Sequence, residues 1–208
     1  MIGSHDSVET WTDALAAASA TPAGGSAAAI AAALAAALVG MVAALTGRRE
    51  SYAAVRSESA AALARAEPLR RRLLALASED IEAFDEVLQA LALPRGTEAE
   101  IARRGAARDA ALKAAAAVQY ELLLLAGETV DLAEVLADRG LRSAAGDAAS
   151  AAFLGAAASR AAYWAIRSNL RRMHEDREAE RMCEQALERL ELVEATEARV
   201  LRRLSEWA

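Results

Sequence analysis

The stretch Thr21-Pro22-Ala23-Gly24-Gly25-Ser26 leads directly into residues 27–46, which carry no charge. Proline and the paired glycines favour a turn, and the small and apolar residues that follow favour a buried helix. The first backbone N–H groups of a helix have no partner inside it and attract negative charge. Gly24, Gly25 and Ser26 could therefore bind a carboxylate or another oxygen of a ligand. A tight turn with Ser26 as an ordinary helix cap is the alternative.

Two arginines, Arg48 and Arg49, follow the opposite end of the same uncharged segment. Cations are favourable there through the helix dipole alone. A guanidinium group also binds carboxylates in a bidentate manner, so this pair could clamp an acidic ligand. The residues themselves do not decide between the two roles.

Residues 79–86 hold a dense group of carboxylates: Glu79, Asp80, Glu82, Asp85 and Glu86. Such a group usually forms a solvated helix face. A carboxylate that faces an apolar interior instead has a raised pKa, and it can then take up and release a proton near neutral pH. Composition alone gives Asp80 no preference over its neighbours.

These candidate residues must be positioned by helices. Helix-forming residues dominate, only three prolines occur, and no window alternates polar and β-branched residues as a strand would. We predict an all-α protein, residues 1–208 forming a single helical domain, because no linker rich in Pro, Gly or Ser divides the chain. The expected helices run from Ser7 or Val8 to Ser19, from Ser26 to Thr46, from Arg49 to Leu93, from Thr97 to Asp138, from a start between Ser143 and Asp147 to Arg172, and from Glu175 to Glu206.

Local signals refine these helices. The first, with Trp11 and Leu15 on one face, should form a hairpin with the second. Pro68 is expected to kink the third helix, Thr97 and Glu100 should form a capping box, and Gly127 is a candidate bend in the fourth helix. The sixth helix repeats apolar residues at spacings of three and four, so it should lie on the bundle surface or pair with a second subunit. That apolar seam comprises Cys183, Ala186, Leu190, Val193, Val200 and Leu204, interrupted by Glu197.

Composition excludes several classes of function. The net charge is −6, and no basic stripe with interleaved aromatic residues is present, so nucleic acid is not an expected partner. Cys183 is the only cysteine, and His5 and His174 lack metal-ligand spacing, so we expect neither a disulfide nor a metal site. The uncharged segment is long enough for a membrane span, but no basic residue precedes it. A buried helix of a cytoplasmic protein is the better interpretation.

Four stretches of the chain carry a resemblance. They are the glycine turn with its alanine-rich helix ending in Met41-Val42-Ala43-Ala44-Leu45-Thr46, Asp80-Ile81-Glu82-Ala83-Phe84 running to Leu93-Pro94-Arg95-Gly96-Thr97, Asp147 opening a second alanine-rich helix, and Ser168-Asn169-Leu170. In their order and spacing across nearly the whole chain they resemble the cyclodeaminase/cyclohydrolase family, helical folate enzymes that occur alone or behind a formiminotransferase domain. No single stretch is specific, but the set is.

The resemblance implies an elongated up-and-down bundle of about six helices, dimeric, that acts on one-carbon derivatives of tetrahydrofolate. The implied reaction is hydrolysis of 5,10-methenyltetrahydrofolate or loss of ammonia from 5-formiminotetrahydrofolate. No formiminotransferase segment accompanies the domain in this sequence, which slightly favours the cyclohydrolase. No cofactor beyond the folate substrate is implied.

The resemblance also assigns roles to single residues. Asp80 matches the family aspartate and becomes the candidate catalytic acid or base. Gly24, Gly25 and Ser26 would bind a folate carboxylate or pterin oxygen, and Arg48 and Arg49 the glutamate tail. Asp147 would bond the pterin ring, or serve only as a helix-capping acid, and Asn169 would contact the ligand or tie helices together. Asp80, the two glycines and Arg49 should then converge on one polar cleft, with or without residues of a second subunit.

The chain departs from the family pattern at several polar positions. Ala23 replaces a glycine, Arg49 a lysine, Gln119 a proline and Ala165 an asparagine, and Gly140-Leu141-Arg142 and Gly146 stand where a polar loop is common. These departures leave a second hypothesis open, a catalytically inactive helical binding or scaffold protein derived from the same family.

Overall fold

The computed structural model describes residues 6–171, 173 and 176–206. Within this part of the chain it contains six α-helices, two short 3₁₀ segments and no strand. The predicted all-α class and the number of helices are confirmed. His5 and His174, and the expected helix limits at Arg172 and Glu175, lie outside the described residues.

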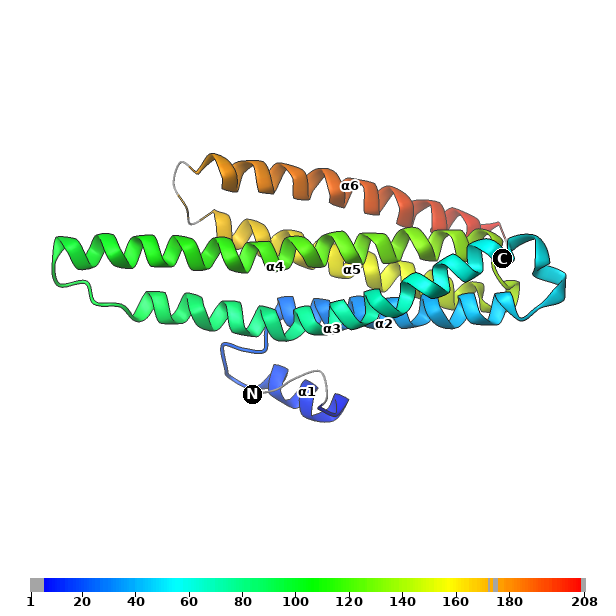
Figure 1. The fold of residues 1–208 in the computed structure, drawn as a ribbon, viewed down its shortest axis with the longest axis horizontal. Helices are drawn as coiled ribbons and strands as arrows, with labels where there is room; N and C mark the ends of the chain where they lie inside the picture. Colours follow the sequence, from blue (N-terminus) through cyan, green and yellow to red (C-terminus); the bar gives the residue numbers. More distant parts are fainter. Residues whose placement is uncertain (1–5, 172, 174–175, 207–208) are drawn as a thin grey trace.

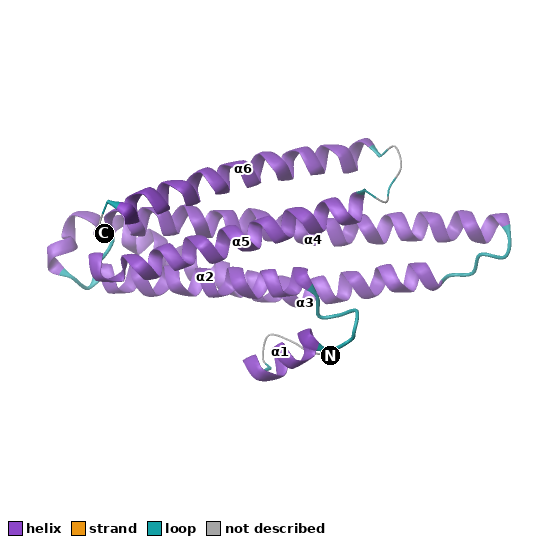
Figure 2. Ribbon diagram, turned by 180° about the vertical axis from the view of Figure 1, so that it is seen from behind, coloured by secondary structure: helices purple, strands orange, loops and turns teal. Residues whose placement is uncertain are grey.

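Four long helices form the bundle, α2 (Gly24–Gly47), α3 (Arg56–Ala92), α4 (Glu98–Arg139) and α5 (Ala145–Leu170). They run up and down in succession, each packs against the next, and α5 closes the ring by packing on α2 (Figure 1). The remaining long helix, α6 (Arg177–Ser205), lies along α4 and α5 on the outside (Figure 2). The elongated up-and-down bundle therefore agrees with the prediction.

The uncharged helix α2 is central because its side chains are small. Ala29, Ala32, Ala36 and Val39 are fully buried against neighbouring helices. Small side chains let helix axes approach closely, which explains the run of alanines. By length and composition α2 and α4 could each cross a membrane, but half of each apolar stretch is buried inside the bundle. Core helices of bundles are often long and apolar in this way.

Two glycines mark close contacts between helices. A Cβ atom at Gly127 of α4 would lie 2.9 Å from Val193 of α6, and one at Gly155 of α5 would lie 2.7 Å from Val130 of α4. The helix α4 runs through Gly127 without interruption. Gly127 therefore permits the close approach of α6. This contact explains the glycine without the bend that was predicted at this position.

The first helix, α1 (Val8–Ala16), is followed by Ala17 in an extended conformation. It therefore ends three residues before the predicted limit, Ser19. The predicted hairpin with α2 is wrong, because α1 lies outside the bundle (Figures 1 and 2). Trp11 is buried, but Leu15 on the same helix is 39% exposed. The physical reason is that the chain is extended at Ala17 and stays non-helical up to Ala23, so the connection is not the tight turn that a hairpin of α1 and α2 requires.

The third helix begins later than predicted. Arg49 is extended (φ −93, ψ 121), and a 3₁₀ segment, Glu50–Val55, precedes α3. The hydroxyl of Tyr52 accepts a hydrogen bond from the Arg142 backbone N–H at 3.1 Å, which holds this segment against the start of α5. The helix α3 then continues through Pro68, whose ring lies on the exposed side.

Two predictions about later elements are confirmed. Thr97 and Glu100 form the expected capping box at the start of α4, with bonds of 3.2 and 3.0 Å. The α6 seam packs on the bundle through Ala186, Leu190, Val193 and Val200, all buried. Glu197, which interrupts the seam, pairs with Arg160 of α5.

Candidate active site

The turn before α2 differs in one respect from the prediction. The helix begins at Gly24 with Ala23 as its extended N-cap residue, so Ser26 lies inside the first turn and is not the cap. The Ser26 hydroxyl accepts from the Ala23 N–H at 3.1 Å and lies 3.0 Å from the Ala23 carbonyl oxygen. Ser26 is fully buried, so its hydroxyl stabilises the turn from within.

Asp80 of α3 faces this first turn. Nε2 of Gln119, on α4, donates a hydrogen bond to Oδ1 of Asp80 at 2.6 Å. A Cβ atom at Gly25 would clash with that nitrogen and with Oδ1, and would lie 2.8 Å from Cγ of Asp80. Three helices thus meet where α2 has no side chain, and the Asp80–Gln119 pair lies against its bare backbone.

The surroundings of Asp80 change its protonation. Burial raises the pKa of the carboxyl above its usual value, and hydrogen bonds from Gln119 and from the backbone and hydroxyl of Ser26 oppose part of that shift. The helix α2 contributes no charged side chain. The nearby carboxylates Glu79 and Glu121 are both bound by Arg72. Asp80 therefore retains its proton to higher pH than an ordinary aspartate, as a proton-transfer group at neutral pH requires.

This raised pKa predicts a pH-dependent stability difference. The folded state holds the Asp80 proton more tightly than the unfolded chain does. The resulting stabilisation is therefore fully present below 3.8, the ordinary pKa of an aspartate, and is lost as pH rises through the folded pKa. Asp80→Asn should become more stable relative to wild type as pH rises from about 3 to about 8. Urea unfolding of both proteins across that range measures the difference, and a constant difference or one of opposite trend would contradict the shift.

The other members of the acidic group lie differently. Glu82 and Glu86 are exposed, and Asp85 is partly buried. Within the group, Asp80 is the residue directed at the start of α2 and bonded to a buried polar side chain. The structure thus separates a residue that composition could not distinguish from its neighbours.

Gln119 is a site residue that no sequence pattern assigned to the site. It is 1% exposed and lies on the buried face of α4 between Ala116 and Leu123. A glutamine at a core position of an otherwise apolar helix face was the available signal, because buried polar groups require partners.

The remaining predicted residues divide between the two ends of the bundle. Asn169, near the end of α5, adjoins Leu170, which packs in the same core cluster as Ala28 near the start of α2. Asn169 therefore lies at the Asp80 end, partly buried.

Arg48, Arg49 and Asp147 lie at the far end, all exposed. There Thr46 accepts from the Leu141 N–H at 2.9 Å, which joins the end of α2 to the loop before α5. A helix of 24 residues is about 36 Å long, so within one chain Arg49 cannot reach Asp80. The expected convergence of Asp80, the glycines and Arg49 in a single subunit is therefore wrong.

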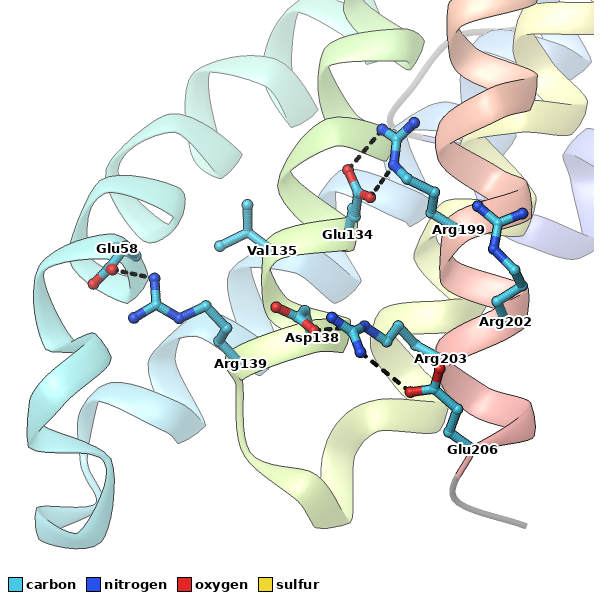
Figure 3. Close-up of a pocket in the computed structure, with 9 residues that line it drawn as sticks. All are labelled: Glu58, Glu134, Val135, Asp138, Arg139, Arg199, Arg202, Arg203 and Glu206. Atoms are coloured by element: carbon cyan, nitrogen blue, oxygen red, sulfur yellow. Dashed lines mark hydrogen bonds and ion pairs between the residues drawn. The ribbon is translucent and has the colours of Figure 1, made fainter.

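A cleft of about 490 Å³ also opens at the far end, between α3, α4 and α6 (Figure 3). Its ion pairs join the three helices: Glu58–Arg139, Glu134–Arg199 and Asp138–Arg203. Its wall contains four arginines, three glutamates and one aspartate, so its formal charges cancel. It connects helices and offers no net attraction for an anionic ligand.

No group of three or more His, Cys, Asp or Glu side chains in the described part of the chain is arranged to hold a metal ion. The chemistry available at the Asp80 end is acid–base chemistry beside helix N–H donors. A family model described as formiminotransferase-cyclodeaminase matches residues 7–189, which include every candidate residue above.

The chain belongs to this family.

Two relatives of this formiminotransferase-cyclodeaminase family member are informative. A methenyltetrahydrofolate cyclohydrolase of Methylorubrum extorquens is 35% identical over 144 residues, 69% of each protein. The crystal structure of formiminotetrahydrofolate cyclodeaminase from Thermotoga maritima superposes with a TM-score of 0.87 at 28% identity, over 97% of each chain. The resemblance inferred from the sequence is confirmed, and both relatives act on folates according to their names.

Proposed function

We propose that this chain is a folate one-carbon enzyme that hydrolyses 5,10-methenyltetrahydrofolate, with Asp80 as its proton-transfer group. The observation that carries the proposal is the partly buried Asp80 carboxyl, bonded to Gln119 and placed beside the open first turn of α2. The relatives support a folate substrate. This polar arrangement does not favour the inactive scaffold.

The hydrolysis needs one group that takes up a proton and returns it. Ionised Asp80 accepts a proton from water as the water oxygen bonds to the carbon between N5 and N10. The protonated carboxyl then donates to N5 as the bond from that carbon to N5 breaks, and the hydroxyl group of the intermediate releases its proton to water, which leaves the formyl group on N10. The ionised carboxylate also stabilises the cationic methenyl carbon before attack. The N–H groups of Gly24 and Gly25 are available to an oxygen of the substrate.

Loss of ammonia from 5-formiminotetrahydrofolate is the second candidate reaction, favoured by the match to the Thermotoga enzyme over almost its whole length. There N10 attacks the carbon of the protonated formimino group, and Asp80 takes the N10 proton and passes it to the departing nitrogen. Ammonia then leaves as the cationic methenyl compound forms. Both reactions pass through a tetrahedral carbon at one position, so one acid–base residue serves either.

A direct assay separates the hypotheses. Purified protein is mixed with 5,10-methenyltetrahydrofolate while its absorbance is followed, and with the formimino compound while ammonia is measured. We expect the first reaction to exceed the buffer rate by the larger factor. Ammonia release without methenyl hydrolysis would identify the deaminase, and a buffer rate in both would support the scaffold.

We further propose a cytoplasmic homodimer that pairs through α2. This charge-free helix exposes Leu34 by 56%, Met41 by 41% and Leu45 by 38%. An apolar face of this kind is typical of an interface. Two α2 helices crossing antiparallel near Leu34 would place the partner subunit's Arg49 over the Gly24 end. The dimer would thereby place the arginines of one subunit near Asp80 of the other, so that guanidinium groups lie close to a carboxylate.

The dimer interface can be tested with Leu34→Glu. A buried glutamate on each side of the two-fold axis disfavours association, so sedimentation equilibrium should give a dimer for wild type and a monomer for the variant. Leu192→Glu is the matched control, because Leu192 of α6 is also exposed, by 59%, but lies away from α2. A monomeric wild type, or a dimeric Leu34→Glu, would refute this interface.

A shared site predicts complementation. Asp80→Asn and Arg49→Ala homodimers should each be poorly active, because each damages both sites. In an equal mixture about half of the dimers combine the two chains, and each of these has one intact site, so about a quarter of wild-type activity should return. No gain on mixing, with subunit exchange verified, would place Arg49 outside the site.

A further inference from the structure

Gln119 has an unusual environment for an amide. It is 1% exposed, and its neighbours one turn away on α4, Ala115, Ala116, Leu122 and Leu123, are buried and apolar. Its Nε2 donates to Oδ1 of Asp80 at 2.6 Å, whereas its Oε1 is buried without a hydrogen-bond partner among the described residues. Most buried side-chain amides have both ends bonded, so this one has an unused acceptor directly beside the candidate catalytic carboxyl.

We propose that Gln119 is the positioning residue of Asp80, holding its carboxyl group against the first turn of α2 and bonding it in both protonation states. This inference rests on the proposed function, in which Asp80 takes up and then releases a proton.

When Asp80 is ionised, the observed geometry is the one that a positioning role requires. The amide N–H donates to the carboxylate, and Gly25 bounds the pair on the α2 side, because even a single added carbon there would clash with both groups. The carboxylate is thus fixed by a neutral donor on one side and by backbone on the other. Fixing a catalytic group in this way avoids reorganisation during the reaction.

In the protonated state the same amide can bond the carboxyl group the other way round. A carboxamide has nearly the same shape after a half-turn about its last carbon–carbon bond, which exchanges nitrogen and oxygen. Oε1 of Gln119 then accepts a hydrogen bond from the Asp80 O–H. A leucine of similar size offers neither bond, and a glutamate would add a competing charge. Glutamine therefore serves both stages of the cycle.

Charged groups around Asp80 do not replace this role. On α3 Glu79 and on α4 Glu121 are both held by Arg72 at the surface. The helix α2 has no charged side chain, and Arg167 of α5 lies over the rings of Tyr163 and Trp164. The hydrogen bond from Gln119 lowers the Asp80 pKa against the effect of burial. Because a bond to the ionised carboxylate is stronger than one to the neutral acid, removal of Gln119 should raise that pKa further.

The test compares Gln119→Leu and Gln119→Met with Gln185→Leu, a matched control on the exposed side of α6. Methionine has a similar volume and adapts to irregular space, so it provides a second variant if leucine packs poorly. The Asp80 carboxyl is titrated by carbon-13 NMR, with its signal assigned through Asp80→Asn. Its midpoint should move to higher pH in both Gln119 variants and stay unchanged in the control.

Activity supplies the second measurement. Because Asp80 must be ionised to accept the proton from water, the acidic limb of the kcat/KM profile should move to higher pH with the NMR midpoint. The loss should be about tenfold or more on that limb and smaller at high pH. A merely structural role would lower activity equally at every pH.

The outcomes separate this inference from the proposed function. An Asp80 midpoint equal to that of wild type in the folded Gln119 variants would overturn the positioning role, even if wild type hydrolyses the folate. A shifted Asp80 midpoint in the Gln119 variants of a protein that turns over no folate would support the positioning role and refute the proposed enzymatic function. Wild-type turnover with parallel shifts of midpoint and profile supports both.

Discussion

Asp80→Asn is expected to lower kcat for methenyltetrahydrofolate hydrolysis by about 10²- to 10⁴-fold while KM changes little, because removal of a general acid–base group costs about that much. Asparagine preserves the shape and can still bond Gln119, whose amide oxygen is free to accept. It cannot take a proton from water. Steady-state kinetics at several pH values measure the effect, and the pH dependence assigned to Asp80 should disappear with it.

Asp85→Asn is the matched control for this loss. Asp85 lies on the same helix and in the same acidic group, but it has no bond to Gln119 and does not face Gly25. Its replacement should leave kcat within about twofold of wild type, as for a surface change away from the chemistry. Equal losses in the two variants would mean that the acidic group acts through its overall charge, and an unaffected Asp80→Asn would remove Asp80 from the mechanism.

Gly25→Ala should abolish most activity and also destabilise the fold. The new methyl group would overlap Nε2 of Gln119 and Oδ1 of Asp80, so the hydrogen-bonded pair must separate or α2 must shift. Overpacking of this kind costs about 1–3 kcal/mol in the free energy of unfolding. Displacement of the carboxyl by about 1 Å is enough for a loss of about 10²-fold in rate. Urea unfolding and the methenyl assay measure the two effects.

Gly24→Ala provides a closely matched comparison, because a Cβ atom at Gly24 meets nothing within 4 Å. Both glycines lie in the first turn of α2, and alanine is the better helix former, so Gly24→Ala should leave stability unchanged or slightly increased. Retention of activity in Gly24→Ala and its loss in Gly25→Ala would show that the closeness of Asp80 and Gln119, and not glycine content, matters. Similar behaviour of both variants would refute this explanation.

The elements predicted correctly are those specified by local signals. The Thr97–Glu100 capping box spans four residues, and the α6 seam follows a helical period, so both can be read from the sequence. The start of α3 could not, because Tyr52 is held by Arg142, ninety residues away in sequence. The position of α1 likewise depends on the path of the non-helical residues 17–23, which no helical period encodes.

The candidate site shows the same division. The glycine turn indicated an exposed helix start, and the family resemblance selected Asp80 from its acidic neighbours. Their meeting with Gln119 depends on a contact between residues 39 positions apart, which no local pattern encodes. Arg48 and Arg49 were placed in the site by resemblance, yet the length of α2 keeps them at the other end of the same chain. Only the arrangement of helices reveals that a second subunit would have to supply them.

The central claim, that the start of α2 and Asp80 form the folate site, is tested most directly by a crystal structure with 5-formyltetrahydrofolate. This stable compound carries its one-carbon unit on N5. We expect this carbon to lie beside the Asp80 carboxyl, close to the N–H groups of Gly24 and Gly25, with Gln119 still bonded to Asp80. A folate bound elsewhere, for example in the cleft between Glu134 and Arg203, with the Asp80 end empty, would contradict it.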